Sequence, residues 1–182
     1  MIQVSKDKKD SKKCCDIMPE YLEKEVLILG CGNILFGDDG FGAAVVQKLN
    51  ALKESHPQLN SQKTGIIDAG TGASHFILSL IDETMPIQKI IIVDIVDYGL
   101  APGEMILLYP KDLPNIPKYH IDAHDMPLAG MLTDLSHHGI KIVVVGCQFK
   151  HMPAPDICFE LSDEVAASVD KAAEMVLEQL EK

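Results

Sequence analysis

The sequence predicts an α/β fold, a single three-layer αβα domain in which helices cover both faces of a twisted, mostly parallel sheet of about five strands. Two observations carry this prediction. Five short apolar runs recur along the chain, as expected for strands buried on both faces of a sheet. Segments with helical periodicity separate most of these runs, and strands that alternate with helices are typical of parallel sheets.

The strands are predicted from the length of each apolar run and from the glycines that end several of them. They cover residues 25–30, 64–70, 89–96, 104–109 and 141–147. Apolar residues at helical spacing predict four helices, over residues 41–52, 74–83, 124–138 and 162–180. Pro127 is tolerated in the first turn of the third helix and Gly139 ends it, while Ser162 is a good N-cap for the fourth.

The composition limits the organisation and the partners of the protein. With 182 residues, of which 47% are hydrophobic, the chain predicts one domain over residues 25–182, preceded by a lysine-rich, flexible N-terminal extension over residues 1–24. The net charge of -11 argues against nucleic acid and anionic membranes as partners. Five cysteines without a C-x-x-C pair, together with the lack of a signal peptide or a long apolar segment, predict a cytoplasmic protein.

A glycine-rich loop, "LGCGNILFGDDGFG", follows the first predicted strand. Gly30 and Gly32 match the start of a dinucleotide-binding fingerprint, and Asp68 could imitate its ribose-binding carboxylate. The third glycine of the fingerprint, which permits close packing of the helix, is missing at its usual position. Asp38 and Asp39 also oppose a phosphate, since like charges about 4 Å apart repel by roughly 4 kcal/mol at an effective dielectric constant near 20. The alternative interpretation is that both aspartates only stabilise a helix N-terminus.

Three residues from different elements could meet at the carboxyl edge of the sheet. Asp94 interrupts an apolar strand, and a carboxylate placed there needs a partner or a purpose. His124 falls at the start of a predicted helix, although a lone histidine is more often a surface or capping residue. With Asp39, these side chains suit a divalent ion such as nickel, zinc, iron or manganese, with positions left open for another ligand. Cys31 is disfavoured as a nucleophile because the carboxylates of the loop oppose formation of a thiolate.

Four segments in this order, "VLILGCGNILFGDDGFG", "IIDAGTGA", "IIIVDIVDYGLAPGEM" and "AHDMPL", resemble the NiFe-hydrogenase maturation endopeptidases over residues 25–180. The resemblance implies an aspartic-type peptidase that removes the C-terminal extension of the large-subunit precursor and recognises the nickel carried by that substrate. It places the metal-contacting, catalytic positions on Asp39, Asp94 and His124, with Asp68 lining the same cleft. Many members have glutamate at the position of Asp39. Other divalent ions could occupy the same ligands.

The loop is most similar to archaeal members that serve deazaflavin-reducing (coenzyme F420) hydrogenases. Two alternatives remain open from the sequence. Gly30, Gly32 and Asp68 also fit a nucleotide-binding, Rossmann-like oxidoreductase domain. A non-catalytic chaperone for nickel-dependent assembly would use the same metal ligands.

Overall fold

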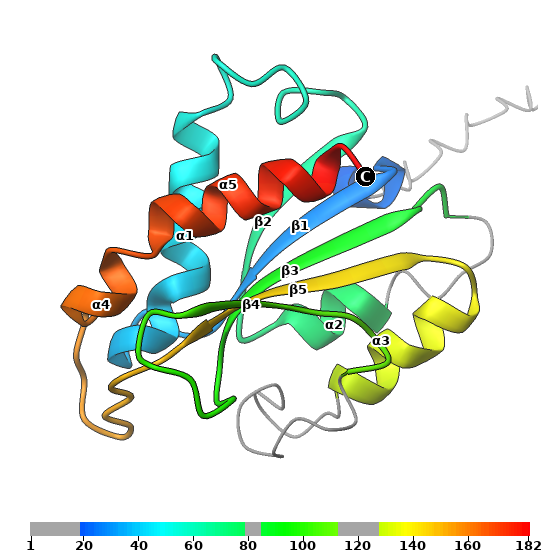
Figure 1. Ribbon diagram of the computed structural model, residues 1–182. Helices are drawn as coiled ribbons and strands as arrows, with labels where there is room; N and C mark the ends of the chain where they lie inside the picture. The colour runs from blue at the N-terminus through cyan, green and yellow to red at the C-terminus, as the bar shows by residue number, and fades with distance from the viewer. Residues whose placement is uncertain (1–18, 79–84, 113–127) are drawn as a thin grey trace, which may run out of the picture.

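The computed structural model describes residues 19–78, 85–112 and 128–182. A five-stranded sheet forms its centre, in the order β2-β1-β3-β5-β4 (Figure 1). The strands are β1 (Val26–Cys31), β2 (Thr64–Gly70), β3 (Lys89–Val96), β4 (Met105–Leu108) and β5 (Lys141–Gln148). All neighbouring pairs are parallel except β4 and β5, which are antiparallel. The predicted α/β class and mostly parallel sheet are confirmed, with each strand end within one residue of its predicted position.

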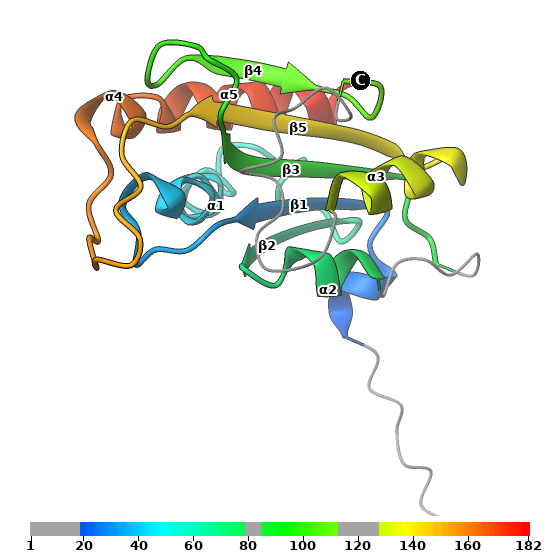
Figure 2. The same cartoon turned by 90° about the horizontal axis from the view of Figure 1, so that it is seen from below.

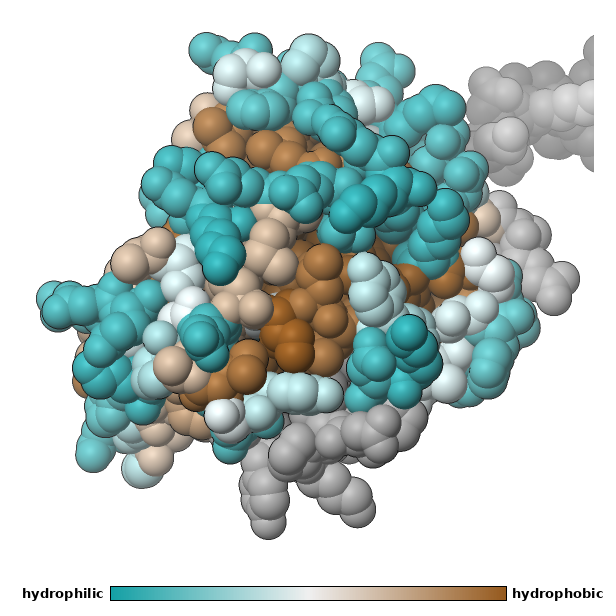
Figure 3. Space-filling model, viewed as in Figure 1, coloured by the Kyte–Doolittle hydropathy of each residue, from teal (hydrophilic) through white to brown (hydrophobic). Residues whose placement is uncertain are grey.

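Helices cover both faces of the sheet, as predicted. α1 (Phe41–Ala51) and α5 (Val169–Leu180) lie on one face, and α2 (Ala73–Leu78) and α3 (Leu128–His137) lie on the other. Figure 2, which views the sheet from below, shows α2 and α3 in front of the strands. Figure 3 shows apolar side chains at the surface between α5 and β4, at the edge of the layer that α1 and α5 form.

The two halves of the core follow from the alternation of side chains along the strands. Leu27 and Leu29 pack into the α2–α3 half, whereas Ile28 between them packs against α1 and α5. On β3, Ile92 and Val93 divide in the same way. This two-sided burial explains why the strands are continuous apolar runs rather than alternating ones.

The last predicted helix is in fact two helices, α4 (Asp163–Ala166) and α5. Ser168 lies at the break, where its hydroxyl donates to the carbonyl oxygens of Gly103 and Glu164 at 2.7 and 2.9 Å. Ser162 occupies the N-cap position of α4, as predicted, but its side chain does not make the capping hydrogen bond. The remaining residues of the second and third predicted helices, 79–83 and 124–127, lie outside the described residues.

Packed structure begins slightly before the predicted domain boundary at residue 25. The 3-10 helix η1 (Glu20–Glu23) places Tyr21 edge-on against Phe76 of α2, with ring centroids 5.1 Å apart. Lys24 holds this turn through Glu20 and the carbonyl oxygen of Gln62. Residues 1–18 of the predicted extension lie outside the described residues, and the division at residue 25 stays a prediction for them.

The strand order indicates where a binding crevice is expected at the sheet. The chain runs from β1 to β2 on one side and later to β3 on the other side of β1. In open α/β sheets, ligands bind outside the carboxyl ends of the strands at such a switch in direction. The glycine-rich loop follows β1 at this point, and Asp94 lies near the carboxyl end of β3.

Candidate functional site

The glycine-rich loop is closed by direct contact between strand β1 and helix α1. A Cβ atom at Gly30 would lie 2.4 Å from the carbonyl oxygen of Gly42, and one at Gly42 would lie 2.2 Å from that of Cys31. Both distances are far below van der Waals contact, so neither position has room for a side chain. Gly42 therefore supplies the close helix packing that the dinucleotide-binding fingerprint assigns to its third glycine. It comes later in the sequence than in that fingerprint, because this loop is longer than a dinucleotide-binding turn.

The inside of the loop is filled by Asp39. Gly32 has a φ of +109°, and a Cβ atom there would lie 2.0 Å from the carbonyl oxygen of Asp39. The backbone N–H of Asn33 donates to Asp39 Oδ2 at 2.9 Å, and that of Gly32 donates to the carbonyl oxygen of Gly70 at 3.1 Å. A phosphate would need such N–H groups for itself. The loop is thus built around its own carboxylate rather than around a bound anion.

Asp38 forms its hydrogen bonds outside the loop, unlike Asp39, and connects the loop to a second segment of the chain. Its buried carboxylate accepts hydrogen bonds from the backbone N–H groups of Lys150, His151 and Ser162, at 2.6–2.8 Å, and from the Ser162 hydroxyl at 3.0 Å. Burial alone would raise the pKa of Asp38, but these four donors outweigh it and lower the pKa below the ordinary value. Asp38 is therefore a structural carboxylate, which also explains why Ser162 does not cap its helix.

Asp94 is buried with far less support. Its side chain is 5% exposed, and among the described residues it accepts one hydrogen bond, from the backbone N–H of Ile95 to Oδ1 at 2.8 Å. Burial raises the pKa of Asp94 well above its usual range, and the negative charge of Asp39 raises it further. The structure thus brings two predicted site residues, Asp39 and Asp94, into electrostatic contact. Such a pair can bind a proton or a cation.

Cys31 lies between the candidate carboxylates. It is 3% exposed, and its pKa is raised well above the usual value, first by burial and then by the charges of Asp94, Asp68 and Asp39. A thiol with a raised pKa stays protonated at neutral pH and is a poor nucleophile. Asp39 of the loop thus opposes a thiolate, as predicted, but burial, Asp94 and Asp68 raise the pKa of Cys31 more.

Asp68 lies on the other side of β1 from Asp94. It is paired in register with Gly30, and its Oδ1 accepts from the backbone N–H of Gly70 at 3.2 Å. Its exposed side chain lines a groove of about 360 Å³ beside the first turns of α1. Asp68 therefore adjoins the crevice, but from a different face of the sheet than Asp94.

His124 lies outside the described residues, so the structure does not place the predicted third ligand. Within the described ranges, no group of three His, Cys, Asp or Glu side chains is arranged to hold a metal ion. The assignment of Asp39, Asp94 and His124 as metal-contacting residues stays a prediction.

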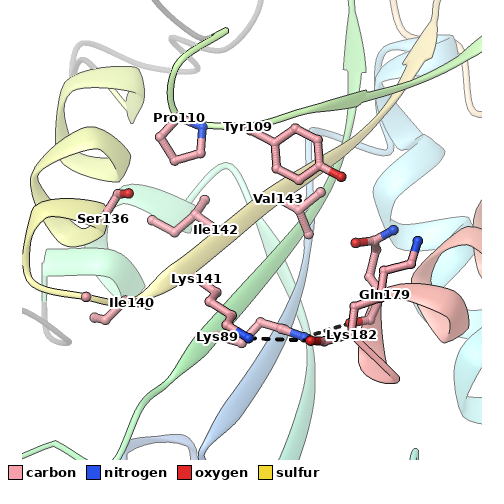
Figure 4. A pocket seen from close by; sticks show the side chains of 11 residues that line it. Lys89, Tyr109, Pro110, Ser136, Ile140, Lys141, Ile142, Val143, Gln179 and Lys182 are labelled. Carbon is pink, nitrogen blue, oxygen red and sulfur yellow. Dashed lines mark hydrogen bonds between the residues drawn. The ribbon is translucent and has the colours of Figure 1, made fainter.

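A second cavity, of about 440 Å³, lies at the amino ends of β3 and β5 (Figure 4). Two of its lysines bind backbone carbonyl oxygens at and after the last turn of α5. Lys89 Nζ donates to the carbonyl oxygen of Gln179 at 2.7 Å, and Lys141 Nζ donates to that of Lys182 at 3.4 Å. Lysine side chains often bind the last carbonyls of a helix in this way. This cavity lies at the opposite edge of the sheet from Asp94 and is not part of the candidate site.

Comparison with known proteins decides the family. The family model for the HycI hydrogenase maturation protease matches residues 43–179. The chain belongs to the hydrogenase maturation proteases. A protein named as a hydrogenase maturation protease from Methanocaldococcus jannaschii is 48% identical over 160 residues, covering 88% of this chain and 99% of that relative. The coenzyme F420 hydrogenase subunit delta of Methanothermobacter thermautotrophicus is 36% identical over 159 residues, covering 87% and 96%.

Solved structures agree with the fold of this maturation protease. The hydrogenase maturating endopeptidase HybD from E. coli superposes with a TM-score of 0.66 at 27% identity, covering 86% of this chain and 92% of that one. The predicted family is confirmed, and with it a peptidase, a hydrolase of peptide bonds. Membership sets aside the oxidoreductase alternative. Within the described residues, no helix has the length and apolar character that crossing a bilayer requires.

Proposed function

We propose that this maturation protease removes the C-terminal extension of the nickel-loaded large-subunit precursor of a NiFe hydrogenase, and that it recognises the nickel in that precursor. The observation that carries the proposal is Asp94, a buried carboxylate with a raised pKa next to Asp39, to which the described part of the chain donates one hydrogen bond. The second relative named above is a subunit of a coenzyme F420 hydrogenase, which makes such a hydrogenase the first substrate to test.

The electrostatics of Asp94 favour a cation delivered by the substrate. Burying a bare carboxylate costs several kcal/mol. Among the described residues, no lysine forms an ion pair with Asp94. A metal ion bound beside Asp39 and Asp94 would offset this cost, and two carboxylate oxygens suit a divalent ion with open positions. In the proposal, His124 adds an imidazole nitrogen to these two ligands.

The proposed role of the nickel is mainly to position the substrate. Ligation by Asp39 and Asp94 would hold the precursor so that the scissile peptide bond lies just beyond the metal. A water molecule then adds its oxygen to the carbonyl carbon, the C–N bond breaks and the departing amine takes a proton. Nickel acting as a Lewis acid, or an aspartate acting as general base, would activate this water. An aspartic-type mechanism without a cysteine nucleophile agrees with the protonated state of Cys31.

Asp39 provides a matched pair of variants to test the proposal. Asp39→Asn keeps the shape of the side chain and removes its charge, so we expect loss of processing without a change in thermal unfolding. Asp39→Glu keeps the charge, and we expect it to retain activity. The measurement is the mass of purified nickel-loaded precursor after incubation with each variant, together with circular dichroism melting curves. Retained processing by Asp39→Asn would remove Asp39 from the site.

The role of the metal is tested separately with precursor that lacks nickel. We expect no mass loss from it, and cleavage at an undiminished rate by pure enzyme would contradict nickel recognition. A precursor that gains nickel but keeps its full mass would instead point to an assembly chaperone. A cytoplasmic location, predicted from the cysteine content, belongs to the same proposal.

A further inference from the structure

We propose that four exposed apolar side chains beside the candidate site form a docking surface for an apolar segment of the nickel-loaded precursor. They are Ile34, Leu35, Ile157 and Phe159, and we refer to them as the apolar ledge. The inference rests on the proposed function and adds to it a contact that is separate from nickel and from the carboxylates.

The exposure of these side chains is unusual for residues of their kind. Phe159 is 70% exposed, Ile157 65% and Ile34 55%. Single apolar residues at a surface need no explanation, but large ones gathered together mark sites of interaction. Four of the six large apolar side chains that are most exposed among the described residues belong to the apolar ledge.

Backbone pairing holds the two segments of the ledge side by side. The N–H of Cys158 donates to the carbonyl oxygen of Leu35 at 2.8 Å, and the N–H of Gly37 donates to that of Cys158 at 2.6 Å. Asp38 adds its hydrogen bonds to Lys150, His151 and Ser162 just beyond this pairing. The apolar side chains therefore stand on a fixed backbone, and a preformed surface loses little conformational entropy when a partner binds.

A groove runs from the apolar ledge along the first turns of α1 to Asp68. Ile34 and Phe159 line the groove of about 360 Å³ whose other lining residues include Asp68. The part beside α1 is lined by small residues, Gly40, Ala43 and Ala44. Small side chains let another polypeptide approach the helix closely. A chain bound in this groove would extend from the apolar ledge toward Asp68.

The charge of the groove selects the kind of chain that fits. Asp68 is the charged residue among the described residues that line it, and the protein as a whole carries a net charge of -11. An apolar segment would match the end of the groove formed by Ile34 and Phe159, and a neutral or cationic group would match the end formed by Asp68. The nickel-loaded precursor is the occupant that we propose, because Ile34 directly follows Asn33, whose N–H donates to Asp39 Oδ2 at 2.9 Å. A precursor whose metal binds beside Asp39 would therefore lie next to the apolar ledge.

The test compares binding by three serine variants. Each is made in an Asp94→Asn background, so that the precursor is not consumed, and the dissociation constant for nickel-loaded precursor is measured by isothermal titration calorimetry. Phe159→Ser and Ile34→Ser should each raise the dissociation constant about tenfold, as truncation of an apolar anchor at an interface does. Tyr109→Ser is the control, because Tyr109 is 39% exposed but lines the cavity at the opposite edge of the sheet. It should bind like the parent.

Two results would overturn the inference. Unchanged dissociation constants for Phe159→Ser and Ile34→Ser would show that the precursor does not touch the ledge, and an equal loss in all three variants would show a nonspecific effect. Sedimentation of the enzyme alone checks whether the ledge joins two copies of this chain, and a dimer that Phe159→Ser dissociates would also overturn the inference. Cleavage of the precursor by the wild-type enzyme is measured in parallel. If the wild-type enzyme does not cleave but the two ledge variants still bind more weakly, the result contradicts the proposed function and not the docking surface.

Discussion

Asp38 and Asp94 are both buried carboxylates at the same end of the sheet, yet their surroundings are opposite. Asp38 accepts four hydrogen bonds, and its pKa is lowered. Among the residues that the structure describes, Asp94 accepts one, from the N–H of Ile95, and its pKa is raised. Burial alone therefore does not separate a structural carboxylate from a functional one. What separates them is how many donors the fold supplies, because a carboxylate left short of donors is available to a proton, a metal or a substrate.

The largest expected effect comes from Asp94→Asn. The amide oxygen can still accept from Ile95, so the free energy of unfolding should change by less than about 1 kcal/mol. Processing of the precursor should fall about a thousandfold, within the range expected for loss of an acid–base or metal-binding group. Rates from the precursor mass and a urea denaturation curve measure the two quantities. Lost stability with retained activity would reverse the roles assigned to the two carboxylates.

The same substitution at Asp38 should act on stability instead. An amide at Asp38 would turn a donor toward the N–H groups of Lys150, His151 or Ser162, which then lose a charged acceptor. We expect the free energy of unfolding to drop by about 3 kcal/mol, since hydrogen bonds to charged groups contribute more than neutral ones. Urea denaturation next to Asp94→Asn gives the comparison directly. Equal stability of the two variants would contradict it.

The pH dependence of unfolding sharpens the comparison further. Because the folded pKa of Asp38 lies below the ordinary value of 3.8, its stabilising contribution is complete above that value and is lost as the pH falls through the folded pKa. The stability difference between wild type and Asp38→Asn should therefore be constant near pH 7 and shrink in acid. Denaturation at several pH values measures this difference. A gap that widens in acid would show that the pKa of Asp38 is raised instead.

The smallest effect is expected from Lys150→Ala. The Lys150 side chain pairs with Glu164 at 2.7 Å on the surface, while its backbone N–H serves Asp38. An exposed ion pair contributes little to stability, so removing the side chain should leave the free energy of unfolding nearly unchanged. This variant isolates the backbone contact from the side-chain contact. A loss as large as that of Asp38→Asn would mean that the side chain holds the second segment in place.

Much of the fold could be predicted from local pattern, because strands buried on both faces are visible as apolar runs. The position of Asp94 at the end of such a run also indicated a site. The different roles of Asp38 and Asp39 could not be read in this way, since the donors to Asp38 come from residues more than a hundred positions later in the chain. Local sequence therefore cannot show which of two adjacent aspartates will have a structural role.

Two further features depended on contacts between distant segments. The apolar ledge forms because the segment with Cys158 pairs with the segment with Leu35. Neither segment has a sequence pattern that predicts this pairing. The break at Ser168 has the same origin, since its hydroxyl binds the carbonyl oxygen of Gly103. Periodicity continues through this residue and gives no sign of the interruption.

The contact between Gly30 and Gly42 turns the loop into a closed ring with a fixed base. Strand and helix meet at this base, so changes within the ring need not alter the angle between them. Residues 33–36 are the outer part of the ring and carry Ile34 and Leu35. Exchanging residues 33–36 between related proteases would replace part of the exposed apolar surface while the contact between Gly30 and Gly42 stays in place. Such an exchange would therefore change the surface that a substrate meets without changing how the strand and the helix pack.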